Sequence, residues 1–360
     1  MTEVRCPSSR APDGLLILPR LRVQNANAIS SSHTWGFPAP TALLGFVHAL
    51  ERRLAGRFSP RFGGVGIVCH RFAAQAFRPN KRQHQVFTQS RNPVYLKRDA
   101  TKFIAEGTPA AIVEEGRAHL ELSLVIAVHG DFDEDWERED FALAAFETAQ
   151  GMRLAGGSLL PPGPRAPRAE WVGWPDAEVD RLAAFRRLRR RLLPGFALVH
   201  RPDLLAERLA ALRAERPAAV ALDALLDLTR LNHRPVLQES EGEAPPTGAA
   251  VWQIERRPGW LVPLPIGYAG LSALHAPGEV AHTRDPVTPF RFVESLLSLG
   301  QWVGPHRLAS LEQLLWHYGG DPQAGLYRCI NRYAGLVPAS DESVSATPVS
   351  AFSVSELQGA

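Results

Sequence analysis

Residues suited to binding a single-stranded nucleic acid are concentrated between positions 20 and 35. They combine guanidinium groups that match phosphates, amides that both donate and accept hydrogen bonds as a base edge requires, and an aromatic ring that can stack on a base. The set consists of Arg20, Arg22, Gln24, Asn25, Asn27, Ser31, His33 and Trp35. We predict an RNA-binding site here, with an ordinary connection that carries asparagines at turn positions as the alternative.

The local sequence predicts a strand, a long polar loop and a helix around this set. The apolar run Leu15–Leu18 has the length of a buried strand, and the alternation of arginines with Leu21 and Val23 fits a strand with one wet face. The asparagines and serines that follow indicate a loop. From Thr41, an apolar repeat at helical spacing indicates a helix.

Further basic residues are expected to join the site. Arg71 follows a short apolar run at Val65–Cys69, which predicts a second strand. Residues 74–110 interleave cations with aromatic rings, a composition typical of surfaces that bind single strands, and a solvated insertion is the alternative. The candidate contacts in this insertion are Arg78, Lys81, Arg82 and Arg91.

The strand pattern is clearest at Arg117–His129. Leucines at alternate positions occupy one face, while Arg117 and His119 lie on the other. We predict that Arg117 belongs to the RNA-binding set. A helix with an acidic start is predicted at Asp133–Gln150. The resulting order of strand, helix, strand, strand and helix fits a split βαβ core.

A glycine pair after this helix offers another way to hold a phosphate. Gly156, Gly157 and Ser158 leave backbone amides unobstructed by side chains, and Arg153 precedes them. The motif is short, and a plain turn is the alternative interpretation. We predict that these four residues contact RNA.

Charge is unevenly distributed along the 360 residues. The net charge is only +3, yet residues 1–120 hold fourteen Arg and three Lys against seven acidic residues, a local excess of ten positive charges. Acidic blocks at Asp131–Asp140 and Glu239–Glu243 offset this excess. A basic half beside acidic patches suits a polyanionic partner.

Several classes of protein do not fit the sequence. Cys6, Cys69 and Cys329 show no spacing typical of a zinc site or a disulfide framework, and we expect neither a metal nor a cofactor. The N-terminus lacks the apolar region of a signal peptide, and no 18-residue apolar run predicts a membrane span. We therefore expect a soluble, cytoplasmic protein.

The chain divides by composition into a core and flanking regions. Residues 14–160 form the predicted core, with residues 74–110 inserted into it. Residues 161–334 form a predicted helical and mixed accessory region that completes the core and provides a partner interface. Residues 1–13 are predicted to be flexible, and residues 335–360 to be a disordered tail.

Two features of the accessory region indicate partners. A predicted helix at Asp176–Leu193 carries six arginines, which favours contact with RNA or an acidic subunit, while a solvated bundle helix is the alternative. Trp260, Trp302 and Trp316 predict a protein interface in the C-terminal third.

Long blocks of this sequence resemble, in one order, the subunit of type I-F CRISPR surveillance (Csy) complexes that holds the 5′ end of the guide RNA. The resemblance covers roughly residues 14 to 333. Besides the opening stretch, the blocks are GVGIVCHRF at Gly64–Phe72, AIVEEGRAHLELSLV at Ala111–Val125, MRLAGGSLLP at Met152–Pro161, RRRLLPGFALV at Arg189–Val199, PGWLVPLPIGYAGLS at Pro258–Ser272 and RFVESLLSLGQWVGPHRLASLEQLLW at Arg291–Trp316.

The resemblance implies an α+β fold with a ferredoxin-like, RNA-recognition-motif-like core, a basic hairpin or thumb at residues 74–110 and a helical C-terminal region. It implies a non-catalytic subunit that binds the crRNA 5′ handle, forms a heterodimer with the large subunit and caps the backbone filament by contacting its first subunit. Target double-stranded DNA would be reached only through the assembled complex, in antiviral defence.

A metal-independent endoribonuclease that processes precursor crRNA is the alternative function. Such chemistry needs a general base near the 2′-hydroxyl and an acid near the leaving oxygen. His33, His70 and His119 are the available candidates in the basic half. Signatures of other hydrolases and of nucleotide-binding loops are absent from the sequence. We therefore favour binding without catalysis.

Overall fold

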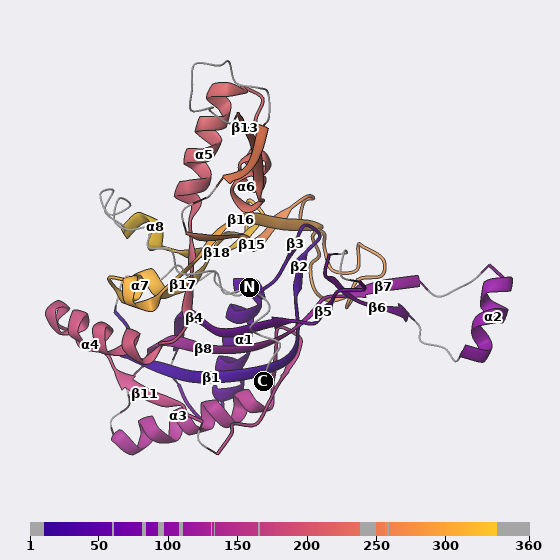
Figure 1. Cartoon of the computed structure of the whole chain (residues 1–360). Coiled ribbons are helices and arrows are strands. Elements are labelled where there is room, and N and C mark those ends of the chain that lie inside the picture. Colours follow the sequence, from indigo (N-terminus) through magenta and orange to yellow (C-terminus); the bar gives the residue numbers. More distant parts are fainter. Residues whose placement is uncertain are drawn as a thin grey trace, which may run out of the picture.

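The computed structural model describes residues 11–336 except 60, 81–83, 93–96, 108–110, 131, 133, 165, 238–249, 256 and 258. Most of the residues predicted to be flexible at the two ends lie outside this range. The described residues form a mixed α/β structure built on one large antiparallel sheet, as the sequence led us to expect (Figure 1). No described helix has the length and apolar character needed to cross a membrane.

Strand β1 (Gly14–Asn27) runs through this sheet and is longer than predicted. Its pairing with β8 (Arg117–His129) shifts register twice, and Arg20 and Asn25, which lie at these shifts, have φ values of 50° and 58°. A bulge of this kind lets a strand absorb an extra residue without ending. The prediction that a loop begins at residue 24 is therefore wrong.

One face of the sheet is covered by two helices. A short hairpin of β2 (Ile29–Ser31) and β3 (Thr34–Trp35) leads from β1 into α1 (Pro40–Leu54). Both α1 and α3 (Asp135–Gln150) pack their apolar residues against the leucine face of β8 to form the main core. The start of α3 is fixed by a capping box between Glu134 and its third helical residue.

Four strands around these helices have the order β10, β1, β8 and β4. Here β4 is Arg61–Ala74 and β10 is Gly157–Leu159, and all the pairs are antiparallel. Strand β9 (Arg153–Leu154) forms a hairpin with β10, while β11 (Glu170–Gly173) pairs with the first residues of β1.

The opposite face of the sheet is covered over only part of its length. Helix α4 (Glu178–Arg191) buries Phe185 and Leu188 in a second apolar cluster with Ile17 and Val125. Beyond this cluster, the same face of β8 carries polar residues and is open to solvent. The change from apolar to polar residues along one face of β8 therefore decides where the sheet is covered.

The C-terminal half contains strands as well as the expected helices. Five strands continue the sheet from β4 and return to it, so that the six strands close into a ring. They are β17 (Leu315–Asp321), β18 (Leu326–Asn331), β15 (Trp260–Gly270), β16 (Val293–Val303) and β12 (Phe196–His200). Trp316 is fully buried, and its Nε1 donates to the Leu198 carbonyl oxygen at 2.8 Å.

The short helices of this half lie along the ring. They are the 3₁₀ turn η1 (Pro305–Arg307), α7 (Leu311–Leu314) and α8 (Tyr333–Leu336). Alternating apolar residues in extended segments of this region are the signal for strands, and long antiparallel pairings between distant segments satisfy their backbone groups.

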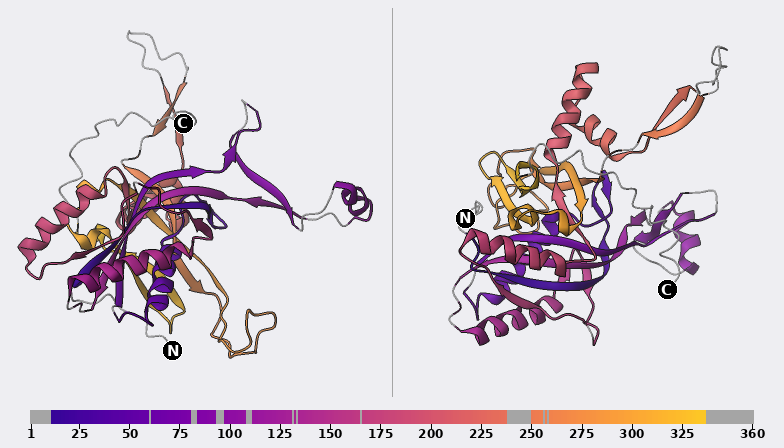
Figure 2. Two further views of the ribbon diagram at one scale, coloured as in Figure 1. Left: turned by 90° about the horizontal axis from the view of Figure 1, so that it is seen from below. Right: turned by 60° about the vertical axis from the view of Figure 1, so that its left-hand side comes forward.

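Two projections leave the body in different directions (Figures 1 and 2). The arm, residues 76–115, contains β5 (Ala76–Phe77), β6 (Val86–Asn92), α2 (Lys97–Ala105) and β7 (Ala111–Glu115), with α2 at its far end. The second projection, residues 202–255, contains α5 (Pro202–Glu215), α6 (Ala221–Thr229), β13 (Asn232–Leu237) and β14 (Ala250–Glu255).

Candidate nucleic-acid interface

The uncovered part of the sheet presents a polar surface, which we call the open face. It is defined by Arg22, Gln24, Asn25, Arg71, His119 and Glu121. All of these side chains except Glu121 are exposed, and Glu121 is half-buried. They come from three neighbouring strands, β1, β8 and β4, so predicted site residues that are far apart in the sequence share one surface.

The cations of the open face are arranged around one carboxylate. Arg22 on β1 and Arg71 on β4 are both in register with Glu121 on the strand between them. Arg20 Nη1 lies 2.8 Å from Glu121 Oε1. Since a single carboxylate faces three guanidinium groups, this row carries an excess of positive charge and suits an anionic chain.

The predicted glycine turn extends this surface at the edge of β1. Gln24 is in register with Ser158, which is in register with Arg153. A Cβ atom at Gly157 would lie 2.8 Å from the Gln24 carbonyl oxygen, so a residue without a side chain is needed for this close approach. Gly156 has a φ of 76°, and its carbonyl oxygen accepts a 2.8 Å hydrogen bond from Arg153 Nη2. Arg153 therefore also closes the turn.

Asn25 is part of a hydrogen-bonded triad. Gln75 Nε2 donates to Asn25 Oδ1 at 2.5 Å and lies 3.0 Å from Nε2 of His119. The backbone N–H of Gln75 donates to the Arg117 carbonyl oxygen at 2.8 Å, which holds Gln75 against β8. No local sequence pattern distinguishes Gln75 as a candidate site residue, and only strand pairing brings it to this surface.

Asn27 and Ser31 have their polar atoms engaged within the β2–β3 hairpin. Asn27 Nδ2 donates to the Ile29 carbonyl oxygen at 2.7 Å, and the Ile29 N–H donates to Asn27 Oδ1 at 3.1 Å. The Ser31 and Thr34 hydroxyl oxygens lie 2.7 Å apart, and the His33 N–H donates to Ser31 Oγ at 3.3 Å. These contacts fit a role in shaping the chain.

Both ring nitrogens of His70 have partners. His70 Nδ1 lies 2.6 Å from the Pro194 carbonyl oxygen, which can only accept, so Nδ1 carries the proton. Nε2 then accepts from the Ser123 hydroxyl at 2.7 Å, and that oxygen accepts from the Arg20 N–H at 3.0 Å. Burial lowers the pKa of His70, so it remains neutral in this network. A general acid would need a proton on Nε2, which this network does not provide.

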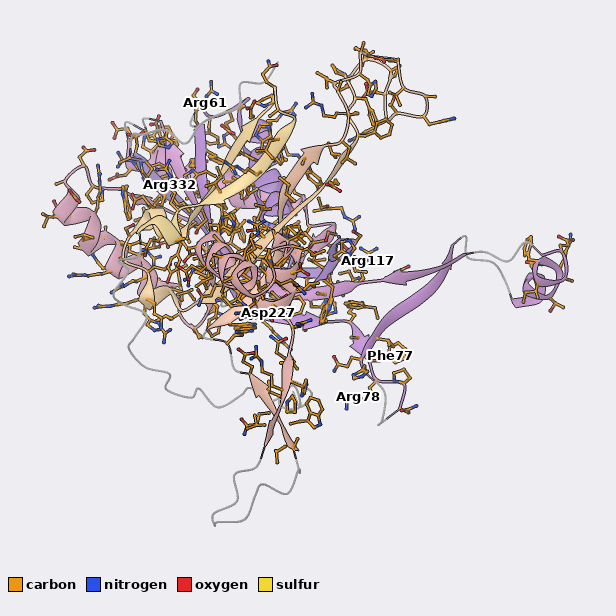
Figure 3. All side chains as sticks on the ribbon, turned by 90° about the horizontal axis from the view of Figure 1, so that it is seen from above. Arg61, Phe77, Arg78, Arg117, Asp227 and Arg332 are labelled. Carbon is orange, nitrogen blue, oxygen red and sulfur yellow. The ribbon has the colours of Figure 1, made fainter. Side chains whose placement is uncertain are left out.

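Aromatic residues lie where the arm joins the body. Trp35 is 63% exposed, and its ring meets Phe87 edge-to-face with centroids 5.4 Å apart. Phe77 and Arg78 are also exposed and lie on the same side of the body as Arg117 (Figure 3). Lys81 and Arg82 lie outside the described residues, whereas Arg91 belongs to β6.

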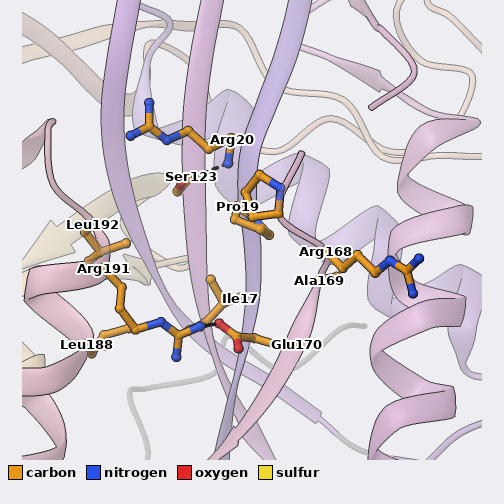
Figure 4. A pocket seen from close by; sticks show the side chains of 11 residues that line it. Ile17, Pro19, Arg20, Ser123, Arg168, Ala169, Glu170, Leu188, Arg191 and Leu192 are labelled. Atoms are coloured by element: carbon orange, nitrogen blue, oxygen red, sulfur yellow. Dashed lines mark hydrogen bonds and ion pairs between the residues drawn. The ribbon is translucent and has the colours of Figure 1, made fainter. Parts of the chain in front are cut away.

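A cavity of about 340 Å³ lies between β1 and α4, with Ile17 and Arg20 on one side and Leu188 and Arg191 on the other. Figure 4 shows Arg20 and Ser123 on one side of it and an ion pair between Arg191 and Glu170 on another. Three further arginines of α4 are exposed, namely Arg186, Arg187 and Arg190. These arginines belong to the arginine-rich helix that the sequence predicted.

Within the described residues, no group of His, Cys, Asp and Glu side chains is arranged to hold a metal ion. The candidate site combines guanidinium groups, amides, a hydroxyl, the His119 imidazole, the Glu121 carboxylate and exposed aromatic rings. Such groups bind anions and base edges through electrostatics, hydrogen bonds and stacking.

Fold and site together define an α/β protein whose central antiparallel sheet exposes an arginine- and amide-bearing face beside a projecting arm. A family model described as "CRISPR-associated protein (Cas_Csy2)" matches residues 16–329. The CRISPR-associated protein Csy2 of Pseudomonas aeruginosa (strain UCBPP-PA14) is 52% identical over 323 residues, which cover 88% of this chain and 95% of that relative. The chain belongs to the Csy2 family of CRISPR-associated proteins, and the resemblance seen in its sequence is confirmed.

Proposed function

We propose that this protein is a non-catalytic subunit of a type I-F CRISPR surveillance complex and that its open face binds the 5′ handle of the crRNA. The observation that carries this proposal is the row of Arg22, Glu121 and Arg71 across three strands. Exposed cations outnumber the carboxylate there, and amides that can contact bases lie directly beside them.

The topology supports a ferredoxin-like core for this function. The chain order β1, α1, β4, β8, α3 and β10, with the sheet order β10, β1, β8 and β4, is that of a split βαβ unit. Both helices cover one face, which leaves part of the other face free for RNA. The arm occupies the connection between β4 and β8 and would extend over a bound strand as a thumb.

Exposed apolar side chains on the second projection and β15 support pairing with the large subunit of the complex. They are Leu222, Leu226, Leu231, Val236, Val251, Trp252, Ile254 and Trp260. The expectation that three tryptophans mark this interface is wrong for Trp316, which is fully buried. We therefore place the proposed interface with the large subunit on the second projection.

The remaining partners follow from the family. The first backbone filament subunit and, through the assembled complex, target double-stranded DNA complete the proposed set, in the cytoplasm. Endoribonuclease activity is less well supported, because His70, one of the three candidate histidines, has both ring nitrogens engaged.

Two measurements on the protein co-purified with the large subunit test the proposal. A labelled cognate handle should bind more tightly than a scrambled RNA of equal length, and binding without preference would contradict handle recognition. Incubation of labelled precursor RNA, without a dedicated nuclease, should leave it intact. Specific cleavage that disappears in a His33→Ala, His70→Ala or His119→Ala variant would instead establish the nuclease.

A further inference from the structure

Gln75 occupies a position on the open face from which a base can be read. It follows β4 directly and joins Asn25 of β1 to His119 of β8 through its side-chain amide nitrogen. The two hydrogen bonds of 2.5 Å and 3.0 Å use both N–H groups of that nitrogen. The orientation of the Gln75 amide is therefore fixed by two neighbouring strands.

The polar side-chain atoms that do not take part in these two hydrogen bonds form a defined pattern of donors and acceptors. Because Asn25 Oδ1 and His119 Nε2 accept from Gln75, the Asn25 amide nitrogen keeps two N–H donors and Gln75 keeps its carbonyl oxygen as an acceptor. His119 then carries its proton on Nδ1, which adds a further donor. Asn25 and His119 are exposed and Gln75 is half-buried, so the triad lies at the surface of the open face.

We propose that Asn25, Gln75 and His119 form a reading triad that recognises the edge of one unstacked base in the bound RNA. Each base offers a donor beside an acceptor on its Watson–Crick edge, and a donor and an acceptor held on two different amides complement that arrangement. This inference rests on the proposed function and names the residues that would give it sequence specificity.

The backbone at Asn25 supports a positional role for the triad. Asn25 has a φ of 58° at a bulge, which turns its amide toward Gln75 instead of leaving it in the regular alternation of β1. Asparagine tolerates this conformation better than most residues. The flanking Arg22 and Arg71 would hold the phosphates and so set the distance of the base from the triad.

The test uses the complex of this chain with the large subunit and a panel of handle RNAs, each with one nucleotide replaced. For the wild type, replacement at one handle position should weaken binding about tenfold or more. In Gln75→Leu, discrimination at that position should be lost, while discrimination elsewhere and the affinity for scrambled RNA stay unchanged. Gln323→Leu is the matched control, because it removes an exposed glutamine in the turn between β17 and β18, outside both the open face and the second projection.

A double variant separates reading from structural support. Asn25→Gly keeps the positive φ but removes the amide, so Gln75→Leu combined with Asn25→Gly should lose no more discrimination than either single variant. Equal weakening for every RNA in Gln75→Leu, or no change at all, would overturn the triad while leaving handle binding intact. A wild type that does not prefer the handle over scrambled RNA would overturn the proposed function itself.

Discussion

Arg22 and Arg71 lie on strands that do not touch each other, yet both are in register with Glu121 on the strand between them. The spacing of strands in a sheet places neighbouring side chains roughly 5 Å apart, so two cations straddle one acid. Because a single carboxylate lies between them, the two guanidinium groups cannot each form an ion pair with a carboxylate of their own. It leaves positive charge available to a ligand.

Removal of either cation should weaken binding without regard to sequence. Arg22→Ala and Arg71→Ala should each reduce affinity for cognate and scrambled single-stranded RNA by the same factor. The slope of log affinity against log salt should fall by roughly 0.7 for each lost phosphate contact. Titrations at several salt concentrations measure both quantities. Arg57→Ala is the control, because Arg57 pairs with Asp140 beside the covered face, and an equal effect there would contradict the assignment.

Removal of the negative charge of Glu121 should strengthen RNA binding, in contrast to removal of an arginine. Glu121→Gln keeps the size of the side chain and one acceptor oxygen, but it removes the negative charge that pairs with Arg20 and with it the carboxylate of the open face. Affinity for scrambled RNA should rise severalfold, with a salt slope steeper by up to roughly 0.7. The same titrations provide the measurement. A loss of affinity would show that Glu121 instead positions the arginines for binding.

Much of the open face was predictable from the alternation of residues along single strands. The pattern of β8 placed His119 and Arg117 opposite its leucines, and the alternation of β1 exposed Arg22. Which strands become neighbours depends on pairing between segments as distant as β1 and β8, which local periodicity does not contain. Gln75 and Glu121 gained their roles only through that pairing.

Other differences have specific physical causes. Positive φ values at Arg20 and Asn25 let β1 continue where its polar residues predicted a loop. Closure of the C-terminal strands into a ring could not be predicted, because it depends on pairings between distant segments, such as β4 with β12 and with β17, which local periodicity does not contain. Trp316 illustrates this point, since its burial follows from the closure of the six strands into a ring.

Asn27 should behave differently from Asn25, although the sequence placed both in one set. Its amide oxygen and nitrogen both engage the backbone of Ile29. Asn27→Ala should therefore lower affinity for cognate and scrambled RNA equally and modestly, through a looser hairpin. Side-by-side titration of the two RNAs measures this, with Asn25→Gly for comparison. Selective loss of cognate binding in Asn27→Ala would make Asn27 a reading residue.

Stability should fall as the pH decreases from neutrality. Burial lowers the pKa of both His200 and His317 to about 4, below the value of about 6.5 for an unfolded chain. Between these values the unfolded state binds more protons, so the free energy of unfolding decreases as pH falls. Above pH 6.5 the protonation of these histidines no longer changes the free energy of unfolding. Each histidine adds at most about 1.4 kcal/mol per pH unit to the slope of that free energy against pH.

Denaturant unfolding at several values between pH 5 and 7 measures this slope. His200→Asn should reduce the slope whatever its effect on absolute stability, because one buried titrating group is removed. The exposed His233→Asn on β13 is the control. An unchanged slope in His200→Asn would show that His200 is not protonated on unfolding in this range.

Asp227 should determine the stability of the second projection without affecting RNA binding. Asp227 is 7% exposed, and its Oδ2 lies 2.5 Å from Arg208 Nε and 2.7 Å from Arg257 Nη2. Desolvation by burial raises its pKa, but the hydrogen bond from Arg208 and the charges of Arg257 and Arg230 lower the pKa by more, so the carboxylate stays ionised. Asp227→Asn leaves these cations without their counter-charge and should cost on the order of 2–4 kcal/mol.

Hydrogen exchange provides the local measurement for this prediction. Backbone amides of α5 and α6 should lose protection in Asp227→Asn, because the carboxylate links α6 to Arg208 on α5 and to Arg257. In titrations without the large subunit, affinity for the handle RNA should stay at the wild-type value, since the open face lies on other strands. The exposed Asp176→Asn, outside any helix or strand, controls for the loss of one negative charge. Protection unchanged at α5 and α6 would mean that apolar packing alone holds the second projection together.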